Sequence, residues 1–409
     1  MIPAIRNHHS VVLFIVSLFV FLVPGVQAQE KESLEVIMTR VPKPPPGFQP
    51  VPLSKPLRYQ TAEGADIEVR VIATGLNHPW GLVSLPDGTL LVSERNNGQL
   101  RIIRNNILEP APVQGLPLVK AGGYSGLNDI VLHPDFASNQ MIYLTYYKPL
   151  DDETASMAVM RGTWNGKAIL NMQDIFIAGA GIGGTSRLLF DQDGMLYVSF
   201  YGATDDSQDL GGLRGKVIRL TDDGQVPADN PFFNTPGARP EIYTYGHRTP
   251  QGFALHPVTG EIWCMEMGPN GGDEINILKP GTNYGWPMIS LGRDYAGEWQ
   301  GAFQQAGYED PVVYWMPAIS VSGMVFYSGD KIPEWKGDLL VGGLRTGEIP
   351  GTGQVQRIKL NIKGQEIRRE ALLADLHHRI RGVYQDVDGY LYALTDDENG
   401  AVLRIGPVE

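Results

Sequence analysis

The chain has 409 residues, a formal net charge of −12 and a single cysteine. The acidic balance argues against a nucleic-acid partner, because such binding depends on Lys and Arg side chains that neutralise phosphates. One cysteine, Cys264, excludes an intramolecular disulfide, and the lack of a Cys-x-x-Cys-His motif excludes a covalently attached c-type haem. Cys264 lies in an apolar run and is predicted to be a small buried side chain.

The first residues predict a secretory signal peptide over residues 1–28. Arg6 precedes an apolar run over residues 11–23, and the small-x-small site Val26-Gln27-Ala28 follows it. This run is shorter than the roughly 20 residues of a membrane span, so cleavage is expected, with an uncleaved anchor as the alternative. No later apolar run reaches spanning length. We therefore expect a periplasmic or secreted protein with no stable membrane span after cleavage.

Residues 29–64 are predicted to form an extended N-terminal segment, either a tether or a strap on the surface. Prolines recur from Pro42 to Pro56, and proline fixes φ and lacks a backbone N–H group. Residues 65–409 have a uniform sequence character and contain no second linker. They are therefore expected to form a single domain.

A short signature recurs within this domain: a turn, often Asp-Gly, followed by an apolar strand. Asp-Gly turns between apolar runs are typical of β-hairpins. The six copies begin at Asp87, Asn139, Asp193, Thr259, Lys336 and Asp388. A second alternating strand follows five of them, over residues 99–104, 216–220, 274–278, 355–360 and 401–405, and residues 158–164 are a looser match after the other copy. Six such β units at long spacing predict an all-β six-bladed propeller.

The strand expected at residues 66–73 precedes the first copy and has no blade of its own. We expect it to complete the sheet formed by the C-terminal strands, so that both chain ends close one blade and no sheet edge is left exposed. A β-sandwich or an eight-stranded barrel would not explain the long spacing. Residues 366–376 are the only segment with a weak helical pattern.

Two polar loops lie in the middle of the chain. Residues 268–274 separate two apolar runs and end in two adjacent carboxylates, and hard cations such as Ca²⁺ prefer carbonyl and carboxylate oxygens. The preceding turn, residues 246–252, carries Arg248, whose planar guanidinium suits a carboxylated ligand. On spacing alone, the alternative is two ordinary polar loops of an all-β protein.

Six motifs in order resemble the soluble quinoprotein aldose sugar dehydrogenases, also called glucose/sorbosone dehydrogenases. They are His78-Pro79-Trp80-Gly81, Leu132-His133-Pro134-Asp135-Phe136, residues 246–252, residues 268–274, Asn283-Tyr284-Gly285-Trp286-Pro287 and Arg379-Ile380-Arg381. The resemblance covers the chain from about residue 76 to residue 405. It implies an exported six-bladed propeller that uses pyrroloquinoline quinone (PQQ) and Ca²⁺ to oxidise a sugar or related alcohol, with an external electron acceptor.

The resemblance also implies roles for individual residues. The carbonyls of Gly268 and Pro269 match the pair that holds the Ca²⁺ next to the quinone. Three further residues resemble ligands of structural Ca²⁺: Asp273, Glu274 and Tyr284. Four residues match the family at or near the cofactor: Arg248, Arg379, Arg381 and Trp315. Thr249 and Arg345 stand at two further cofactor positions, where the family has an asparagine and a lysine. For Trp315, a buried core ring is the alternative.

The chain departs from the family at the positions that contact substrate. The family's general base is a histidine four residues before an arginine, and here that position is Gly183. No histidine occurs between His133 and His247. His377 and His378 are possible substitutes, or else polar surface residues, and the carboxylates of Asp205, Asp206 and Asp209 are further alternatives. Tyr124 stands where the family has a sugar-binding glutamine.

Three hypotheses follow from these observations. The first is a PQQ- and Ca²⁺-dependent oxidoreductase of this family with an altered substrate and base. The second is a ligand-binding propeller that has lost catalysis. The third, least favoured, is a Ca²⁺-dependent lactonase-like hydrolase, since one fold hosts unrelated functions.

Overall fold

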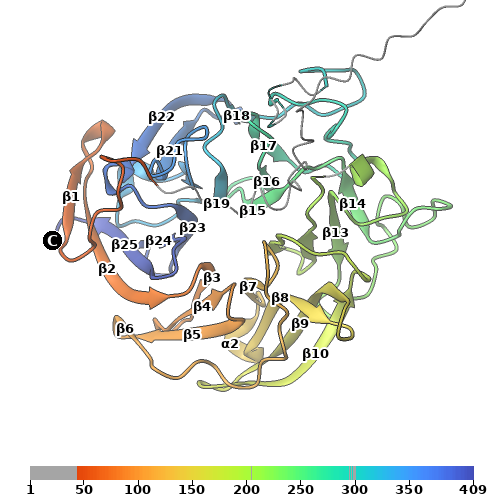
Figure 1. Ribbon diagram of the computed structural model, residues 1–409, viewed down its shortest axis with the longest axis horizontal. Coiled ribbons are helices and arrows are strands. Elements are labelled where there is room, and N and C mark those ends of the chain that lie inside the picture. Colours follow the sequence, from red (N-terminus) through yellow and green to blue (C-terminus); the bar gives the residue numbers. More distant parts are fainter. Residues whose placement is uncertain (1–43, 204, 294, 296, 298–300) are drawn as a thin grey trace, which may run out of the picture. The chain divides into compact units, whose positions relative to one another are not determined.

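The computed structural model describes residues 44–409 except residues 204, 294, 296 and 298–300. The predicted signal peptide lies outside the described residues. The described part of the chain contains six antiparallel sheets placed around a common axis (Figure 1). The predicted six-bladed β-propeller is therefore confirmed.

The first three blades follow one another along the chain, each with its first strand innermost. Blade 1 contains β3 (Pro79–Ser84), β4 (Leu90–Glu94), β5 (Gln99–Arg104) and β6 (Ile107–Leu108). Blade 2 contains β7 (Leu127–Leu132), β8 (Met141–Pro149), β9 (Ala155–Trp164) and β10 (Ile169–Ile177). Blade 3 contains β11 (Leu188–Phe190), β12 (Leu196–Ser199), β13 (Lys216–Leu220) and β14 (Ile242–Tyr245).

Blades 4 and 5 repeat this order, and blade 6 takes strands from both ends of the domain. Blade 4 contains β15 (Pro250–Leu255), β16 (Ile262–Glu266), β17 (Asp273–Ile277) and β18 (Val313–Trp315). Blade 5 contains β19 (Val321–Phe326), β20 (Leu339–Gly343), β21 (Gln354–Leu360) and β22 (Glu366–Leu372). Blade 6 contains β23 (Ile380–Gln385), β24 (Leu391–Thr395), β25 (Gly400–Pro407), β2 (Asp66–Leu76) and β1 (Leu57–Gln60). In every blade the recurring signature forms the second strand.

The closing blade joins the two ends of the domain as the sequence predicts. The long strand β2 pairs antiparallel with β25, from Ile67 opposite Pro407 to Leu76 opposite Gly400. The edge strand β1 then pairs with β2, so the segment expected to be an extended strap also contributes a strand. The pairing supplies hydrogen-bond partners for backbone groups that an open sheet edge would expose.

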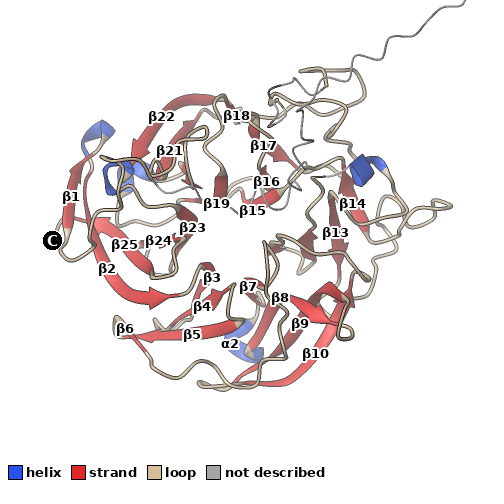
Figure 2. Cartoon of the chain, in the orientation of Figure 1, coloured by secondary structure: helices blue, strands red, loops and turns tan. Residues whose placement is uncertain are grey.

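Helices are few and short in the described residues (Figure 2). They are the α-helix α2 (Phe136–Asn139) and the 3₁₀ turns η1 (Ala62–Gly64), η2 (Asp205–Gln208), η3 (Pro333–Trp335) and η4 (Ala374–Leu376). The weak helical prediction for residues 366–376 is wrong, because β22 pairs there with β21 and only η4 is helical. Pairing with a neighbouring strand overrides a weak local pattern. No helix in the described part of the chain is long and apolar enough to cross a membrane.

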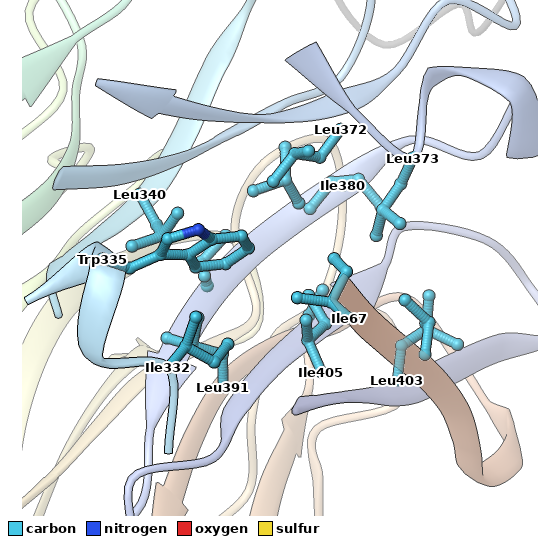
Figure 3. Packing of buried hydrophobic residues seen from close by; sticks show 14 of the residues in the cluster. Ile67, Ile332, Trp335, Leu340, Leu372, Leu373, Ile380, Leu391, Leu403 and Ile405 are labelled. Atoms are coloured by element: carbon cyan, nitrogen blue, oxygen red, sulfur yellow. The ribbon is translucent and has the colours of Figure 1, made fainter. Parts of the chain in front are cut away.

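Apolar side chains fill the space between neighbouring blades. Figure 3 shows the cluster between blades 5 and 6, where Trp335 from η3 packs with Leu340 from β20 and Leu391 from β24. Ile380, fully buried in this cluster, anchors the start of β23. Burial of an isoleucine side chain contributes about 1.5–3 kcal/mol to folding. Cys264 is buried and free, as predicted.

Candidate cofactor-binding site

Two arginines at the start of the inner strand β23 share one buried carboxylate. Arg379 precedes β23, and Arg381 lies within it, where the pairing with β24 shifts register between Ile380 and Gly382. Such irregularities re-aim side chains. The Nη2 group of each donates to Asp396 Oδ2, over 3.0 Å for Arg379. The other carboxylate oxygen of Asp396, Oδ1, lies 3.0 Å from His78 Nδ1. Burial alone would raise the pKa of Asp396, but the Arg381 and Arg379 guanidiniums hold it well below its usual range. Asp396 is therefore ionised and fixes both arginines.

The ring of Trp80, which is fully buried, lies among three guanidiniums. The guanidinium carbons of Arg381, Arg187 and Arg95 lie 4.3, 5.1 and 5.3 Å from the ring centroid. Cations are attracted to the face of an indole ring, most strongly where water is excluded. Burial lowers the pKa of Arg381 to about 10, which leaves the side chain charged at neutral pH. This concentration of positive charge favours an anionic ligand.

Arg187 ties together the inner ends of several blades. It precedes β11 in blade 3, and its buried guanidinium donates to oxygens of blades 1, 2, 4 and 6. These are Trp80 O, Asp129 Oδ1, Gln251 O, Arg381 O and Tyr384 Oη, at 2.8–3.3 Å. A charged group with this many partners holds the strand ends in fixed relative positions.

A cavity of about 320 Å³ continues along the propeller axis beyond Arg187. It is lined by the later residues of all six inner strands, among them Leu132, Leu189 and Val325. Arg248, Arg379 and Arg381 are absent from its lining. The Arg187 network therefore separates the arginines at the strand starts from a largely apolar channel.

Arg248 joins the two polar loops that the sequence singles out. Its Nη1 group donates to the Gly268 carbonyl over 2.6 Å, and its guanidinium carbon lies 5.3 Å from the Trp286 ring centroid. Its backbone N–H donates to Glu266 Oε2 over 2.6 Å. Glu266 also lies 2.9 Å from Nδ1 of the buried His247. The turn is therefore anchored to β16, with its guanidinium against the predicted cation loop.

Several buried polar atoms in this region have no hydrogen-bond partner. They are Arg248 Nε, Arg379 Nε, Arg381 Nε, Thr249 Oγ1, Gln251 Oε1 and Asn128 Oδ1. A buried polar atom without a partner costs about 1–3 kcal/mol, so such atoms rarely gather in one place without a reason. The residues therefore fit a polar, anionic ligand such as PQQ, whose carboxylates and carbonyls would offer acceptors to these N–H groups.

The predicted calcium residues lie in and beside β17. The Asp273 carboxylate accepts backbone N–H groups of Gly268, Ile319 and Val321 over 2.9–3.1 Å, and so shapes the loop before β17. Tyr284 Oη donates to the Ile277 carbonyl over 2.6 Å. These contacts give Asp273 and Tyr284 structural roles, and their function as calcium ligands stays a prediction.

Glu274 is the carboxylate in this region that best fits a cation. It lies directly opposite Glu266 in the pairing of β16 with β17. Burial, followed by repulsion from Glu266, Asp273 and Asp310, raises the pKa of Glu274 well above its usual range. A divalent cation would offset this repulsion. Among the described residues, no group of three His, Cys, Asp or Glu side chains is arranged to hold a metal, so carbonyl oxygens would have to complete the site.

The Gly183 position is covered by a tyrosine ring. A Cβ atom placed on Gly183 would lie 2.7 Å from Tyr147 Cε2 and 3.0 Å from Ser125 Oγ. Ser125 Oγ accepts the Gly184 N–H group over 3.0 Å. The ring centroid of Tyr124, the residue before Ser125, lies 5.9 Å from the guanidinium carbon of Arg95. Gly183 is therefore linked to the arginine cluster through residues 124 and 125, and a histidine would fit only if Tyr147 moved.

The two candidate substitute bases are both held by other groups. His378 Nδ1 lies 3.1 Å from Asp397 Oδ2, and its Nε2 lies 2.9 Å from the Val51 carbonyl. His377 Nδ1 lies 2.8 Å from the Gly351 carbonyl. None of these three contacts is made with an arginine of the cluster, and a role of either histidine as base stays a prediction.

The remaining predicted cofactor residues lie in different surroundings. Thr249 is buried beside Arg248, and Arg345 follows β20, where its N–H donates to the Ile319 carbonyl over 3.1 Å. Trp315 lies on the outer strand β18, and its indole N–H donates to Gln356 Oε1 over 2.7 Å. It belongs to the core between blades 4 and 5, which favours the core interpretation of this ring.

Four residues of the site were not predicted to be functional: Trp80, Arg95, Arg187 and Asp396. Trp80 lies in the family motif at residues 78–81, but no role was assigned to it. Arg187 is the arginine four residues after Gly183 that marks the family's histidine position. Arg95 and Asp396 come from the segments that follow β4 and β24, the second strands of their blades. Arg95 and Asp396 thus occupy the same position in two different blades, and this repetition is a sequence signal that could have identified both residues.

The fold and site together define a class: a six-bladed β-propeller with a buried cluster of arginines at one end of its axis. Residues 76–404 match the family described as Glucose / Sorbosone dehydrogenase. The chain belongs to this family.

Relatives with known names support the assignment. Aldose sugar dehydrogenase YliI of Escherichia coli is 38% identical over 361 residues, which cover 85% of this chain and 94% of the relative. Quinoprotein glucose dehydrogenase B of Acinetobacter calcoaceticus is 28% identical, over 85% of this chain and 89% of the relative.

Solved structures give the same picture. The soluble aldose sugar dehydrogenase of E. coli in its apo-form has a TM-score of 0.77 at 38% identity, over 84% of this chain and 100% of that chain. The PQQ-bound aldose sugar dehydrogenase of Streptomyces coelicolor has a TM-score of 0.64 at 29% identity, over 84% of this chain and 100% of that chain.

Proposed function

We propose that this protein binds PQQ and Ca²⁺ and oxidises a sugar or a related alcohol, acting in the periplasm or outside the cell. The observation that carries the proposal is the set of three guanidiniums of Arg248, Arg379 and Arg381, each with a buried Nε group that has no partner. The PQQ-bound structure of a relative at 29% identity supports the choice of ligand. Electrons would leave to an external acceptor.

PQQ, when bound, supplies a quinone that accepts a hydride from the substrate carbon. Arg379 and Arg381 would bind its anionic groups, and Asp396 holds both guanidiniums in place for it. Preorganised donors of this kind are effective because they need no rearrangement during the reaction. Arg187 lines the axial cavity and donates to the Arg381 carbonyl, so it lies between the arginine cluster and this cavity.

The proton of the substrate hydroxyl needs a separate acceptor. Gly183 offers none, and the loss of a general base typically costs about 10²–10⁴ in rate. A second candidate function is therefore a propeller that binds its ligand without turnover. The ring of Tyr147 against Gly183 favours this alternative for simple aldoses.

Reconstitution distinguishes these functions. The purified protein is titrated with PQQ in the presence of Ca²⁺, binding is followed by calorimetry and absorbance, and a panel of sugars and alcohols is screened with a reducible dye. Saturable PQQ binding with dye reduction supports the oxidoreductase. Binding without reduction of dye by any substrate supports the binding protein, and absence of PQQ binding contradicts the proposal.

Chelation of Ca²⁺ is expected to lower the melting temperature. A ligand that binds only the folded state contributes about 2.7 kcal/mol at one hundred times its dissociation constant. The measurement is thermal unfolding with added Ca²⁺ and with a chelator. The variant Glu274→Gln removes the carboxyl group opposite Glu266 that a bound cation would ionise, so its melting temperature should respond less to the chelator. An equal midpoint for the wild-type protein in both conditions would argue against bound Ca²⁺.

A further inference from the structure

The N-terminal strap, residues 44–56, lies against the loop between β22 and β23, residues 373–379. It precedes the residues matched by the family, 76–404. Its Phe48 carbonyl would lie 2.1 Å from a Cβ atom on Gly351, and the Phe48 ring lies 5.4 Å from the ring of His377. The Val51 N–H donates to the Leu376 carbonyl over 2.9 Å. The strap therefore packs on this loop through His377 and Leu376, and on the loop before β21 through Gly351.

The loop beneath the strap has a strained backbone. Leu373 and His377 have φ values of 61° and 58°, in the left-handed region. For residues other than glycine this conformation costs roughly 1–2 kcal/mol each, and it persists only where the surroundings enforce it. The strap supplies such contacts on one side of the loop.

The loop connects directly to the arginine cluster. His378 lies 3.1 Å from Asp397, and the next residue, Arg379, donates to Asp396 over 3.0 Å. The Asp396 N–H donates to the Arg379 carbonyl over 2.9 Å, and the Asp397 carbonyl accepts the His78 N–H over 2.9 Å. Two consecutive side chains are thus paired with two consecutive carboxylates, so a displacement of His378 would also displace Arg379.

We propose that the N-terminal strap is part of the cofactor-binding apparatus, and that His378 is a positioning residue through which it holds Arg379 and Arg381 ready for the ligand. This inference rests on the proposed function, because it takes PQQ to be the ligand that Arg379 and Arg381 bind. It adds a chain segment that lies outside the family match.

The partners of His378 require a protonated ring. Both ring nitrogens face acceptors, the Asp397 carboxylate and the Val51 carbonyl, and a neutral imidazole could donate to only one of them. The other titratable groups of its loop are Asp375, His377 and Arg379. Burial alone would lower the pKa of His378, but the bonds to Asp397 and Val51 raise it above the ordinary value of 6.5.

Strap attachment is therefore expected to depend on pH. Because the folded-state pKa is raised, the stabilisation is complete below pH 6.5 and is lost as the pH rises through the raised value. Protection of residues 376–381 against hydrogen exchange, corrected for the intrinsic pH dependence of exchange, should fall over this range in the wild-type protein. His378→Gln, which does not titrate, should show no such step. The same step in the variant would contradict the assignment to His378.

One pair of variants tests the strap itself in the full chain. Val51→Pro removes the N–H that donates to Leu376, whereas Val51→Ala keeps both backbone groups and shortens a partly exposed side chain. With PQQ and Ca²⁺, calorimetry should show about tenfold weaker binding for Val51→Pro, the size of effect seen when a supporting partner is lost. Val51→Ala should bind as the wild-type protein does. Hydrogen exchange of residues 376–381 without PQQ should separate the two variants in the same way.

The outcomes separate this inference from the proposed function. If the wild-type protein and Val51→Pro bind PQQ equally, the strap plays no part in the site, although the proposed function stands. If the wild-type protein binds no PQQ, both proposals fail. A lower melting temperature for Val51→Pro with unchanged PQQ affinity identifies a merely structural strap and overturns the inference.

Discussion

Replacing Arg381 by Ala is expected to weaken PQQ binding at least tenfold. The Arg381 guanidinium is buried over Trp80, bonded to Asp396, and retains an Nε group without a partner. A hydrogen bond to a charged group contributes about 1.5–3 kcal/mol, and a tenfold change in affinity corresponds to about 1.4 kcal/mol. The measurement is calorimetric titration with PQQ at constant Ca²⁺ and salt concentrations.

The matched control is Arg404→Ala. Arg404 also stacks on an aromatic ring, with its guanidinium carbon 4.5 Å from the Tyr390 centroid, but it lies on β25 with Glu409 as its ion-pair partner. The control should bind PQQ like the wild-type protein. Arg381→Lys keeps the charge without the planar fork and should give an intermediate affinity. Equal affinity for the wild-type protein and Arg381→Ala would show that Arg381 does not contact the cofactor.

Restoring the family's histidine at Gly183 is expected to raise sugar oxidation only when space is made for it. The wild-type protein should oxidise simple aldoses very slowly or not at all. Gly183→His alone would place its Cβ atom within 2.7 Å of the Tyr147 ring. The double variant Gly183→His with Tyr147→Ala removes that contact and should increase dye reduction with glucose. A general base contributes about 10²–10⁴ in rate, and a misplaced sugar can offset about a hundredfold of this gain.

The single variant Tyr147→Ala is the control for the double variant. It opens the same space without a base, so any gain that it shows reflects access and not proton transfer. Rapid aldose oxidation by the wild-type protein would mean that another group already serves as base. If PQQ binds fully and no variant has activity, the binding-protein alternative is supported.

The sequence determines the architecture of this protein to a large extent. Each blade carries its own turn and alternating strands within a short stretch of chain, so the pattern is local and can be recognised without the fold. The closing strand at residues 66–73 was found in the same way, since it lacks a blade of its own. The motifs around Arg248, Gly268 and Arg379 also lie in short segments, and they were sufficient to indicate the family.

The tertiary structure decides which side chains meet. Trp80, Arg187 and Arg381 are far apart in sequence and come together only because the inner strands of different blades start at the same end of the axis. The weak helical pattern at residues 366–376 gave way to strand pairing with β21. Likewise, nothing local in residues 44–56 indicates that Val51 contacts His378. The repeating pattern predicts which strand closes the ring, but it does not specify which side chains of distant segments come into contact once the ring is closed.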